Sequence, residues 1–305
     1  MPLAVGPAIS ASGGFSGEPM FIATLIAADR LARGDISAAR DALGRAADLE
    51  WIEEGSACDL LLGDEPGGVL EGLLPGVDVV VQRRDGRRKR LLVADMDSTM
   101  ISVECIDELA DYAGLKAEVA AVTEQAMRGE LDFEAALDAR VALLKEMDEA
   151  VIDRCREERV RLTPGARTLV QTMQAHGAYT LLVSGGFTRF AEPVAAAIGF
   201  EAALANELVI SDGRLAGTVR KPIVGAAAKR RALVEMAESR RISLAETMAV
   251  GDGANDIPMI EAAGLGVAYH GKPALAAVAD ARIEANDLTA LLYAQGYRRA
   301  DWVAD

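Results

Sequence analysis

The sequence is poor in cysteine and histidine. Among 305 residues it holds only three cysteines and two histidines, namely Cys58, Cys105, Cys155, His176 and His270. Because these residues lie far apart along the chain, they offer neither a disulfide framework nor a zinc site of the Cys/His type. We therefore expect a chain that works in a reduced, cytoplasmic compartment.

Long hydrophobic runs and an excess of positive charge are also missing. No apolar stretch approaches the roughly 18 residues that a membrane-spanning helix needs. The first 17 residues are broken by Pro, Gly and Ser, which is not the pattern of a signal peptide. The net charge of −15 disfavours general binding to nucleic-acid phosphates or to a membrane surface. We expect neither kind of partner, so the function must lie in a local site.

The length predicts two domains, at roughly 150 residues per domain. In residues 1–82 the pattern predicts strand, helix, strand, strand, helix, strand, which is a ferredoxin-like α+β arrangement. Asp35 is predicted to cap the first helix, and Gly55 to join the second and third strands. The predicted elements are Phe21–Ala27, Ile36–Ala47, Leu49–Glu54, Cys58–Leu62, Val69–Leu74 and Val77–Gln82.

The domain boundary is predicted at residues 83–90, which hold six cations in eight residues. Such a run can be a short nucleic-acid or localisation patch, but nothing aromatic lies beside it. Charge runs usually mark solvated connections, so a solvated linker is favoured.

From Leu91 onward, short apolar strands alternate with helical stretches. This alternation predicts a Rossmann-like α/β fold whose parallel sheet is covered on both faces and binds ligands at the carboxyl ends of its strands. A helical insert without strands, at about residues 102–162, is expected to cover the first strand. The predicted strands are Leu91–Ala94, Tyr179–Val183, Met248–Val250 and Leu265–Tyr269.

Two carboxylates, Asp95 and Asp97, follow the first of these strands. At this spacing they can hold a divalent cation, act as nucleophile and acid, or merely cap the next helix. An EF-hand is excluded, because Met100 stands where its loop needs glycine and Ile106 where it needs glutamate.

The next strand ends carry further polar groups. Ser184, Gly185 and Gly186 have the composition of an anion cradle, although a tight strand-to-helix turn explains them equally well. Asp252 and Asp256 follow the third strand. Four aspartates at one sheet edge would repel one another without a cation, and their hard oxygen atoms suit Mg²⁺.

An apolar stripe with three- and four-residue spacing runs along the insert (Phe133, Leu137, Val141, Leu144). Arg140 lies on the same helix face, where a guanidinium needs an anionic partner: either an internal salt bridge or a ligand. Taken alone, Glu104 is most simply a solvated helix residue, and Lys229 a surface lysine.

Other hydrolytic classes lack their motifs. A serine hydrolase would have to combine Ser184 with His176 or His270, but Leu182 stands where the nucleophile motif needs its first glycine. The Gly-x-x-x-x-Gly-Lys-Ser/Thr pattern is also missing, which excludes a P-loop nucleotidase.

Taken in order, these motifs resemble those of the phosphoserine phosphatase family within the haloacid dehalogenase superfamily, over about 200 residues. The resemblance implies a core of that superfamily with a helical cap at about 102–162, in residues 91–305. The N-terminal residues resemble an ACT-like regulatory domain only in arrangement, as either an amino-acid-binding module or a dimerisation and packing domain, so a homodimer through it is an open expectation. The matching pieces are Asp95–Met100, Glu104, Asp132–Val141, Val183–Phe187, Lys229 and Val250–Asp256.

The resemblance also implies roles for individual residues. Asp95 would be the nucleophile that forms an aspartyl-phosphate, and Asp97 the general acid and base. Mg²⁺ would be held by Asp95, Asp252 and the main-chain carbonyl of Asp97, with Asp256 supporting it from outside. Phosphate would be bound by Thr99, Ser184, Gly185, Gly186 and Lys229, and the rest of the substrate by Glu104, Arg140, Phe133, Met127 and Asn255.

The implied reaction is hydrolysis of O-phospho-L-serine to L-serine and phosphate, the last step of serine biosynthesis. Glu104 would take the substrate's ammonium and Arg140 its carboxylate, with Phe133 and Met127 forming the apolar wall. Other phosphomonoesters remain as alternatives: phosphothreonine, homoserine phosphate or a phosphoprotein. A further alternative is an amino-acid-sensing chain in which catalysis is secondary.

Overall fold

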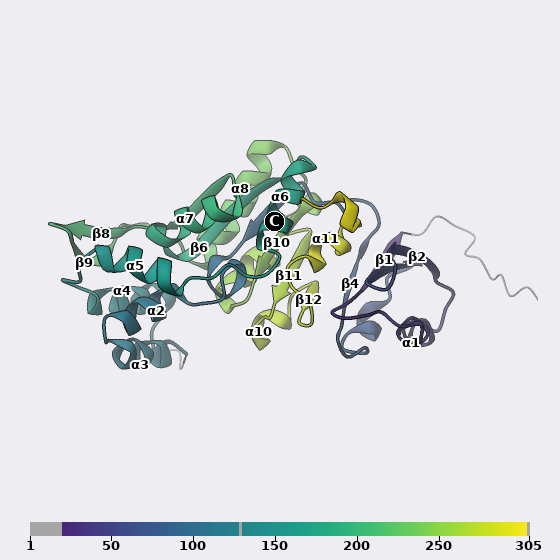
Figure 1. Ribbon diagram of the computed structural model, residues 1–305, viewed down its shortest axis with the longest axis horizontal. Helices are drawn as coiled ribbons and strands as arrows, with labels where there is room; N and C mark the ends of the chain where they lie inside the picture. Colours follow the sequence, from purple (N-terminus) through teal and green to yellow (C-terminus); the bar gives the residue numbers. More distant parts are fainter. Residues whose placement is uncertain (1–19, 128–129, 304–305) are drawn as a thin grey trace, which may run out of the picture.

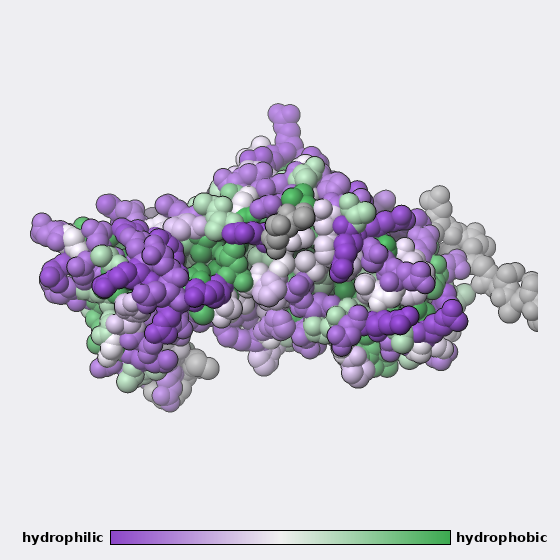
Figure 2. All heavy atoms as spheres, in the orientation of Figure 1, coloured by the Kyte–Doolittle hydropathy of each residue, from purple (hydrophilic) through white to green (hydrophobic). Residues whose placement is uncertain are grey.

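The structure is a computed structural model and describes residues 20–127 and 130–303. The molecule is elongated: a small unit built on β1–β4 lies at one end, an α/β core in the middle and a cap at the other end (Figure 1). Its outer surface is mostly hydrophilic, and apolar side chains gather where the cap meets the core (Figure 2). None of the described helices combines the length and apolar character needed to cross a membrane.

The N-terminal unit is an antiparallel sheet with the strand order β2-β3-β1-β4. The predicted strands are confirmed, but the first helix begins earlier, and the second is only a short 3-10 turn. Asp35 lies inside the first turn of α1, where its carboxylate accepts the N–H of Ala32 at 2.8 Å. The elements are β1 (Phe21–Ala27), α1 (Arg33–Leu43), β2 (Asp48–Glu53), β3 (Ala57–Leu62), η1 (Gly67–Leu70) and β4 (Val77–Arg83).

The core is a parallel sheet with the order β12-β11-β10-β5-β6-β7, which confirms the predicted α/β fold. Sequence analysis missed β7 and β12. The strands are β5 (Leu91–Ala94), β6 (Tyr179–Phe187), β7 (Ala202–Asn206), β10 (Thr247–Gly251), β11 (Leu265–Tyr269) and β12 (Ala281–Ile283), and the helices are α6 (Ala166–Ala175), α7 (Thr188–Ile198), α8 (Ala226–Arg240), α9 (Ile257–Ile260), α10 (Pro273–Ala276) and α11 (Ala290–Ala294).

The central strands are buried on both faces, which explains their continuous apolar runs. In β5, Leu92 and Ala94 pack into one hydrophobic core, whereas Leu91 and Val93 pack into a second core on the other face. Since side chains alternate along a strand, a strand between two helix layers must be apolar at every position.

The cap consists of the predicted helical insert and of a hairpin that the sequence analysis did not anticipate. The hairpin follows β7, packs against α4 and joins the chain between α4 and α5 through hydrogen bonds of Leu215 with Glu146 and Met147. The cap therefore has a strand component, contrary to the purely helical expectation. Its elements are α2 (Cys105–Tyr112), α3 (Lys116–Met127), α4 (Phe133–Leu143), α5 (Ala150–Arg159), β8 (Leu208–Ser211) and β9 (Arg214–Val219).

The segment at residues 83–90 is not fully solvated, contrary to the prediction. The Arg87 guanidinium donates to Asp59 of β3 at 2.6 Å and to the carbonyl of Ala294 at 3.1 Å. Lys89 is only 5% exposed, and its Nζ donates to the carbonyl of Ala245 at 3.0 Å. These two cations fasten the N-terminal unit to the core.

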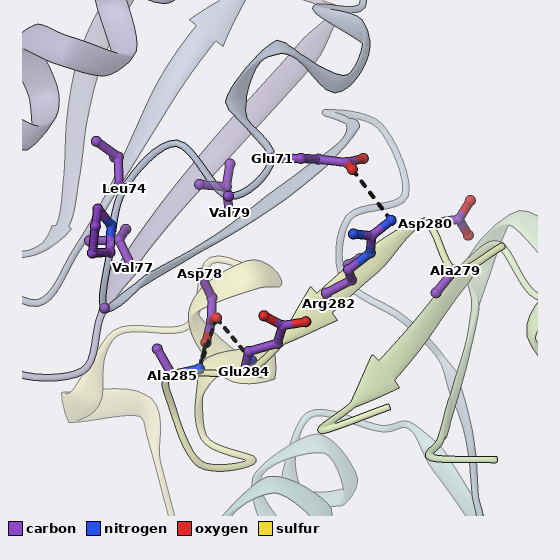
Figure 3. Close-up of a pocket in the computed structure, with 14 residues that line it drawn as sticks. Glu71, Leu74, Val77, Asp78, Val79, Ala279, Asp280, Arg282, Glu284 and Ala285 are labelled. Atoms are coloured by element: carbon purple, nitrogen blue, oxygen red, sulfur yellow. Dashed lines mark hydrogen bonds and ion pairs between the residues drawn. The ribbon is translucent and has the colours of Figure 1, made fainter. Parts of the chain in front are cut away.

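A second connection joins the two sheets into one of ten strands, because Val80 of β4 pairs with Ala281 of β12. Nearby, the Asp78 carboxylate accepts the N–H groups of Glu284 and Ala285 at 3.0 and 3.1 Å, and that of Asn286 at 3.0 Å. Figure 3 shows this contact at the edge of a cavity of about 370 Å³ between β4 and the chain around β12.

Candidate active site

The loops that follow β5, β10 and β11 meet the last residues of β6 at one edge of the core sheet, and the cap lies over them. Together they enclose a cavity of about 650 Å³. Because β6 extends to Phe187, beyond the predicted end at Val183, Ser184, Gly185 and Gly186 belong to this strand. Most of the predicted site residues line this cavity, from both the core and the cap, whereas Thr99, Ser184, Lys229 and Asp256 are fully buried and do not line it. Those that line it are Asp95, Asp97, Glu104, Phe133, Arg140, Gly185, Gly186, Asp252 and Asn255.

Asp95 directly follows β5 and is buried. Its Oδ1 accepts the N–H of Met96 at 2.8 Å and lies 2.7 Å from Nζ of Lys229. Lys229, on α8, is completely buried and also pairs with Asp256 at 2.7 Å, so it is not a surface lysine. Burial works to lower the pKa of Lys229, but Asp95 and Asp256 outweigh burial and raise it. A permanent positive charge is thus held beside Asp95.

Three carboxylates near Lys229 could together bind a divalent cation. Asp95, Asp252 and Asp256 each offer an oxygen, and these atoms all lie within 4.8 Å of one another. Burial and the neighbouring Asp256 raise the pKa of Asp95 well above its ordinary value, so a further positive charge among them would be stabilising. Buried, hard oxygen ligands of this kind suit Mg²⁺.

Asp97 lines the cavity and is held by two hydrogen bonds. Its Oδ1 accepts the N–H of Cys105 at 2.9 Å, and its Oδ2 accepts the hydroxyl of Ser184 at 3.3 Å. Burial, followed by the charge of Glu104, raises the pKa of Asp97 to about 6. A carboxyl group with such a pKa can both donate and accept a proton near neutral pH.

The predicted anion cradle has the close packing that its glycines suggested. A Cβ on Gly186 would lie 2.8 Å from Oδ2 of Asp97, and one on Gly185 would lie 3.1 Å from the ring of Phe133. The Gly186 N–H donates to Oγ of the buried Ser184 at 2.8 Å. Thr99 differs from this group: it is fully buried, and no described residue bonds its hydroxyl. It does not line the cavity.

The cap contributes a carboxylate and a guanidinium. Oε1 of Glu104 accepts the hydroxyl of Ser98 at 2.9 Å. Arg140 donates to the carbonyl of Ala136 at 3.2 Å, and within the described part of the chain its guanidinium has no ion-pair partner. Burial lowers the pKa of Arg140, whereas Asp107 and Glu104 oppose that shift. The Arg140 guanidinium is therefore available to an anion that enters the cavity.

Some predicted contacts are only partly described. Phe133 lines the cavity and borders both Gly185 and Gly225. Asn255 lines the cavity. Met127 ends α3, and its side chain lies outside the described part of the structure.

Sequence analysis missed Ser98 and Lys272, which both line the cavity. Lys272 follows β11, and its Nζ lies 3.0 Å from Asp252 and 4.0 Å from Glu104. A signal for Lys272 was available, because the carboxyl end of the fourth predicted strand was already expected at this edge. Ser98 had no such signal, since a serine beside two aspartates is equally typical of a turn.

Comparisons with known proteins find similar sequences over most of this chain. A relative from Streptomyces coelicolor named phosphoserine phosphatase is 46% identical over 237 residues, which are 75% of this chain and 58% of the relative. A phosphoserine phosphatase from Albidiferax ferrireducens is 42% identical over 232 residues, 74% of this chain and 95% of the relative. Several relatives are longer, and the chain spans less than two thirds of their length.

A solved structure shares both the fold and the size of this chain. The unliganded probable phosphoserine phosphatase of Vibrio cholerae has a TM-score of 0.76 and 34% identity, and the match covers 93% of this chain and 88% of the other. The family model described as haloacid dehalogenase-like hydrolase matches residues 92–261, which include both aspartate pairs, Ser184 and Lys229. The chain therefore belongs to the haloacid dehalogenase-like hydrolase family.

Proposed function

We propose that this chain hydrolyses O-phospho-L-serine to L-serine and phosphate. One observation carries the proposal: a single cavity has Asp95 and Asp97 at its core side, with the buried Lys229 paired to Asp95, and the opposite charges of Glu104 and Arg140 at its cap side. The core wall suits a phosphoryl group. The cap wall suits the ammonium and the carboxylate of an amino acid, and relatives named phosphoserine phosphatase support this assignment.

In the first half of the reaction, a carboxylate oxygen of Asp95 forms a bond to phosphorus while the bond from phosphorus to the serine oxygen breaks. Asp97 donates its proton to that oxygen, because a serine alkoxide is a poor leaving group. In the second half, Asp97 accepts a proton from water, the water oxygen bonds to phosphorus, and Asp95 is released. The pKa of about 6 suits Asp97 to both steps.

Charge stabilisation carries much of the rate increase in such reactions. Lys229 keeps a buried ammonium beside Asp95, and the hydroxyl of Ser184 and the N–H groups of Gly185 and Gly186, at the end of β6, receive phosphate oxygens. Mg²⁺, when held by Asp95, Asp252 and the main-chain carbonyl of Asp97 with Asp256 in support, supplies positive charge at the phosphate. Thr99, whose buried hydroxyl has no hydrogen-bond partner among the described residues, is assigned to the same phosphate site.

The cap residues select the substrate. Glu104 binds the ammonium, Arg140 binds the carboxylate, and Phe133 and Asn255 border the carbon chain. A site built for two charged groups discriminates strongly against molecules that lack them, because its own charges then stay unpaired. Phosphothreonine and homoserine phosphate keep both groups and remain as alternative substrates, and a phosphoprotein remains as a third.

We further assign residues 1–82 to a ferredoxin-like, ACT-like domain, 83–90 to a linker, and 91–305 to the phosphatase domain with its cap. The strand order β2-β3-β1-β4 supports the first assignment, although its second helix is reduced to one turn. An amino-acid-binding role and a dimerisation role both remain open for this domain. The three free, buried cysteines fit a cytoplasmic site of action.

The test is phosphate release from three substrates, with and without Mg²⁺: L-phosphoserine, its deamino analogue 3-phosphonooxypropanoate, and its decarboxy analogue phosphoethanolamine. The expected result is Mg²⁺-dependent release that is fastest with phosphoserine by a wide margin. Equal rates on all three would contradict the assignment of Glu104 and Arg140 and leave only a general phosphatase. No release from any of them, with Mg²⁺ present, would overturn the proposed function.

A further inference from the structure

We propose that Ser98 is a positioning residue for Glu104, and that it thereby helps to set the preference for substrates that carry an ammonium group. This inference rests on the proposed function, in which Glu104 binds that ammonium. The core loop after β5 would then take part in substrate selection, together with the cap.

The first support is the geometry of Glu104. It precedes α2, and its Oε1 accepts the Ser98 hydroxyl at 2.9 Å. Nζ of Lys272 lies 4.0 Å from the same oxygen. Within the described residues, Oε2 has no hydrogen-bond or ion-pair partner, and Glu104 lines the cavity. One oxygen is therefore held by the core, and the other is left for a ligand.

The second support is the backbone of Ser98, which has φ 54° and ψ 4°. This is the left-handed region, where glycine carries the least strain and a serine is uncommon. Strained backbone conformations of this kind concentrate at functional sites. Because a glycine would relieve the strain but could not donate to Glu104, the hydroxyl is the feature that makes a serine useful here.

The third support is how firmly the surrounding loop is held. The Ser98 N–H donates to the carbonyl of Val103 at 3.2 Å, and the neighbouring Asp97 accepts the N–H of Cys105 at 2.9 Å. The loop thus folds back on the start of α2 on both sides of Glu104. A hydroxyl presented from such a loop has little freedom, so its hydrogen bond can orient a carboxylate.

Lys272 reinforces this arrangement from the other side. Its main-chain N–H donates to the carbonyl of Asp252 at 2.7 Å, and its Nζ lies 3.0 Å from the Asp252 carboxylate. Its ammonium thereby stays near Glu104 although the side chain is 63% exposed. Ser98 makes the shorter contact with Glu104, so we expect the larger effect on selectivity from Ser98.

The experiment measures the ratio of kcat/KM for L-phosphoserine to kcat/KM for 3-phosphonooxypropanoate, which lacks only the ammonium. Loss of one hydrogen bond to a charged group predicts that Ser98→Ala lowers this ratio by about 3- to 30-fold. Ser102→Ala is the matched control, since Ser102 is an exposed serine four residues away, and its ratio should match that of the unaltered chain. Ser98→Gly removes the same hydroxyl while relieving the left-handed strain, and it should lower the ratio equally if Ser98→Ala folds poorly.

A double-mutant cycle tests whether Ser98 acts through Glu104. Glu104→Gln alone should remove most of the preference, and adding Ser98→Ala to it should change the ratio by less than about twofold. If Ser98 had only a structural role, Ser98→Ala would lower kcat/KM equally for both substrates, or its effect on the ratio would add to that of Glu104→Gln.

The outcomes separate the two proposals. If the unaltered chain shows no preference for L-phosphoserine, both the proposed function and this inference are overturned. If that preference exists and depends on Glu104, but Ser98→Ala and Ser98→Gly retain it in full, only the inference about Ser98 is overturned. Equal losses on both substrates would also overturn it, because Ser98 would then not act through the site for the ammonium group.

Discussion

The two walls of the cavity are built differently. On the core side, the side chains of Asp95, Asp256 and Lys229 are at most 6% exposed, and they are positioned by segments that follow parallel strands and by one long helix. On the cap wall, the side chain of Glu104 is 42% exposed, and Arg140 is only partly buried on α4. The core charges are buried and lie close together, whereas the cap charges are partly exposed to solvent.

The difference in exposure suits the two groups of charges to different tasks. Buried charges interact strongly because little water screens them, which suits groups that must stabilise a reacting phosphate. Such clusters are weak sources of stability, since desolvation offsets the attraction. The cap charges can exchange water for a substrate at little cost, which suits recognition. Core variants should therefore lower the rate for every substrate. Cap variants should lower it only for substrates that carry the ammonium or carboxylate that the altered residue binds.

The largest effect is expected at the nucleophile. Asp95→Asn should lower phosphate release by about 10⁴-fold or more with both L-phosphoserine and p-nitrophenyl phosphate, because the attacking oxygen is lost. Steady-state phosphate release measures this, with circular dichroism as the check on folding. A loss of activity confined to L-phosphoserine would contradict the expectation that core variants affect every substrate, because it would make Asp95 a recognition residue.

Metal dependence should come next. Treatment with a chelator should abolish release from both substrates, and Mg²⁺ should restore it. Asp256→Asn should raise the Mg²⁺ concentration needed for half-maximal activity by about 10- to 100-fold, as expected for a group that supports the direct ligands. A Mg²⁺ titration of each form measures this. Unchanged activity after complete removal of divalent ions would refute the assignment of the aspartate cluster.

On the cap wall, Arg140→Ala should lower kcat/KM for L-phosphoserine by about 10²-fold, because the substrate's carboxylate loses a charged partner. Release from phosphoethanolamine, which has no carboxylate, should change by less than about twofold. Arg140→Lys should recover only part of the loss, since an ammonium cannot make the paired contacts of a guanidinium. Equal losses on both substrates would place Arg140 with the core group.

The smallest effect on activity is expected far from the active-site cavity, at Asp78 of β4. Asp78→Ala removes the acceptor for several main-chain N–H groups near β12, and it should lower the free energy of unfolding by about 1–3 kcal/mol. The kcat on L-phosphoserine should stay within about twofold. Urea unfolding measures the first and phosphate release the second, with Asp64→Ala at an exposed position as the control. A large loss of kcat would mean that the N-terminal unit influences the active site.

Much of the core could be predicted because its signals are local. Short apolar strands followed by polar residues located the loops of Asp95, Ser184 and Asp252. The missed β7 (Ala202–Asn206) is rich in alanine and lies at the edge of the sheet, and β12 (Ala281–Ile283) has three residues, so neither carries a clear strand pattern.

What could not be predicted depends on partners distant in sequence. Arg87 and Lys89 sit in a run of cations that locally resembles a solvated linker, yet Asp59 and the carbonyl of Ala245 bind them. Lys229 was ordinary by position and became informative only through the resemblance, because its two carboxylate partners lie 134 and 27 residues away along the chain. Local patterns carry no information on such pairings.

The pairing of β4 with β12 also bears on aggregation. A strand with unpaired N–H and carbonyl groups is a template for strands of other molecules. In the ten-stranded sheet, β4 covers β12, so the open edges are β2 and β7. β2 carries Asp48, Glu50 and Glu53, whose like charges oppose such contacts. A shortened chain that began at Leu91 would uncover β12, and we expect its solubility to suffer before its chemistry does.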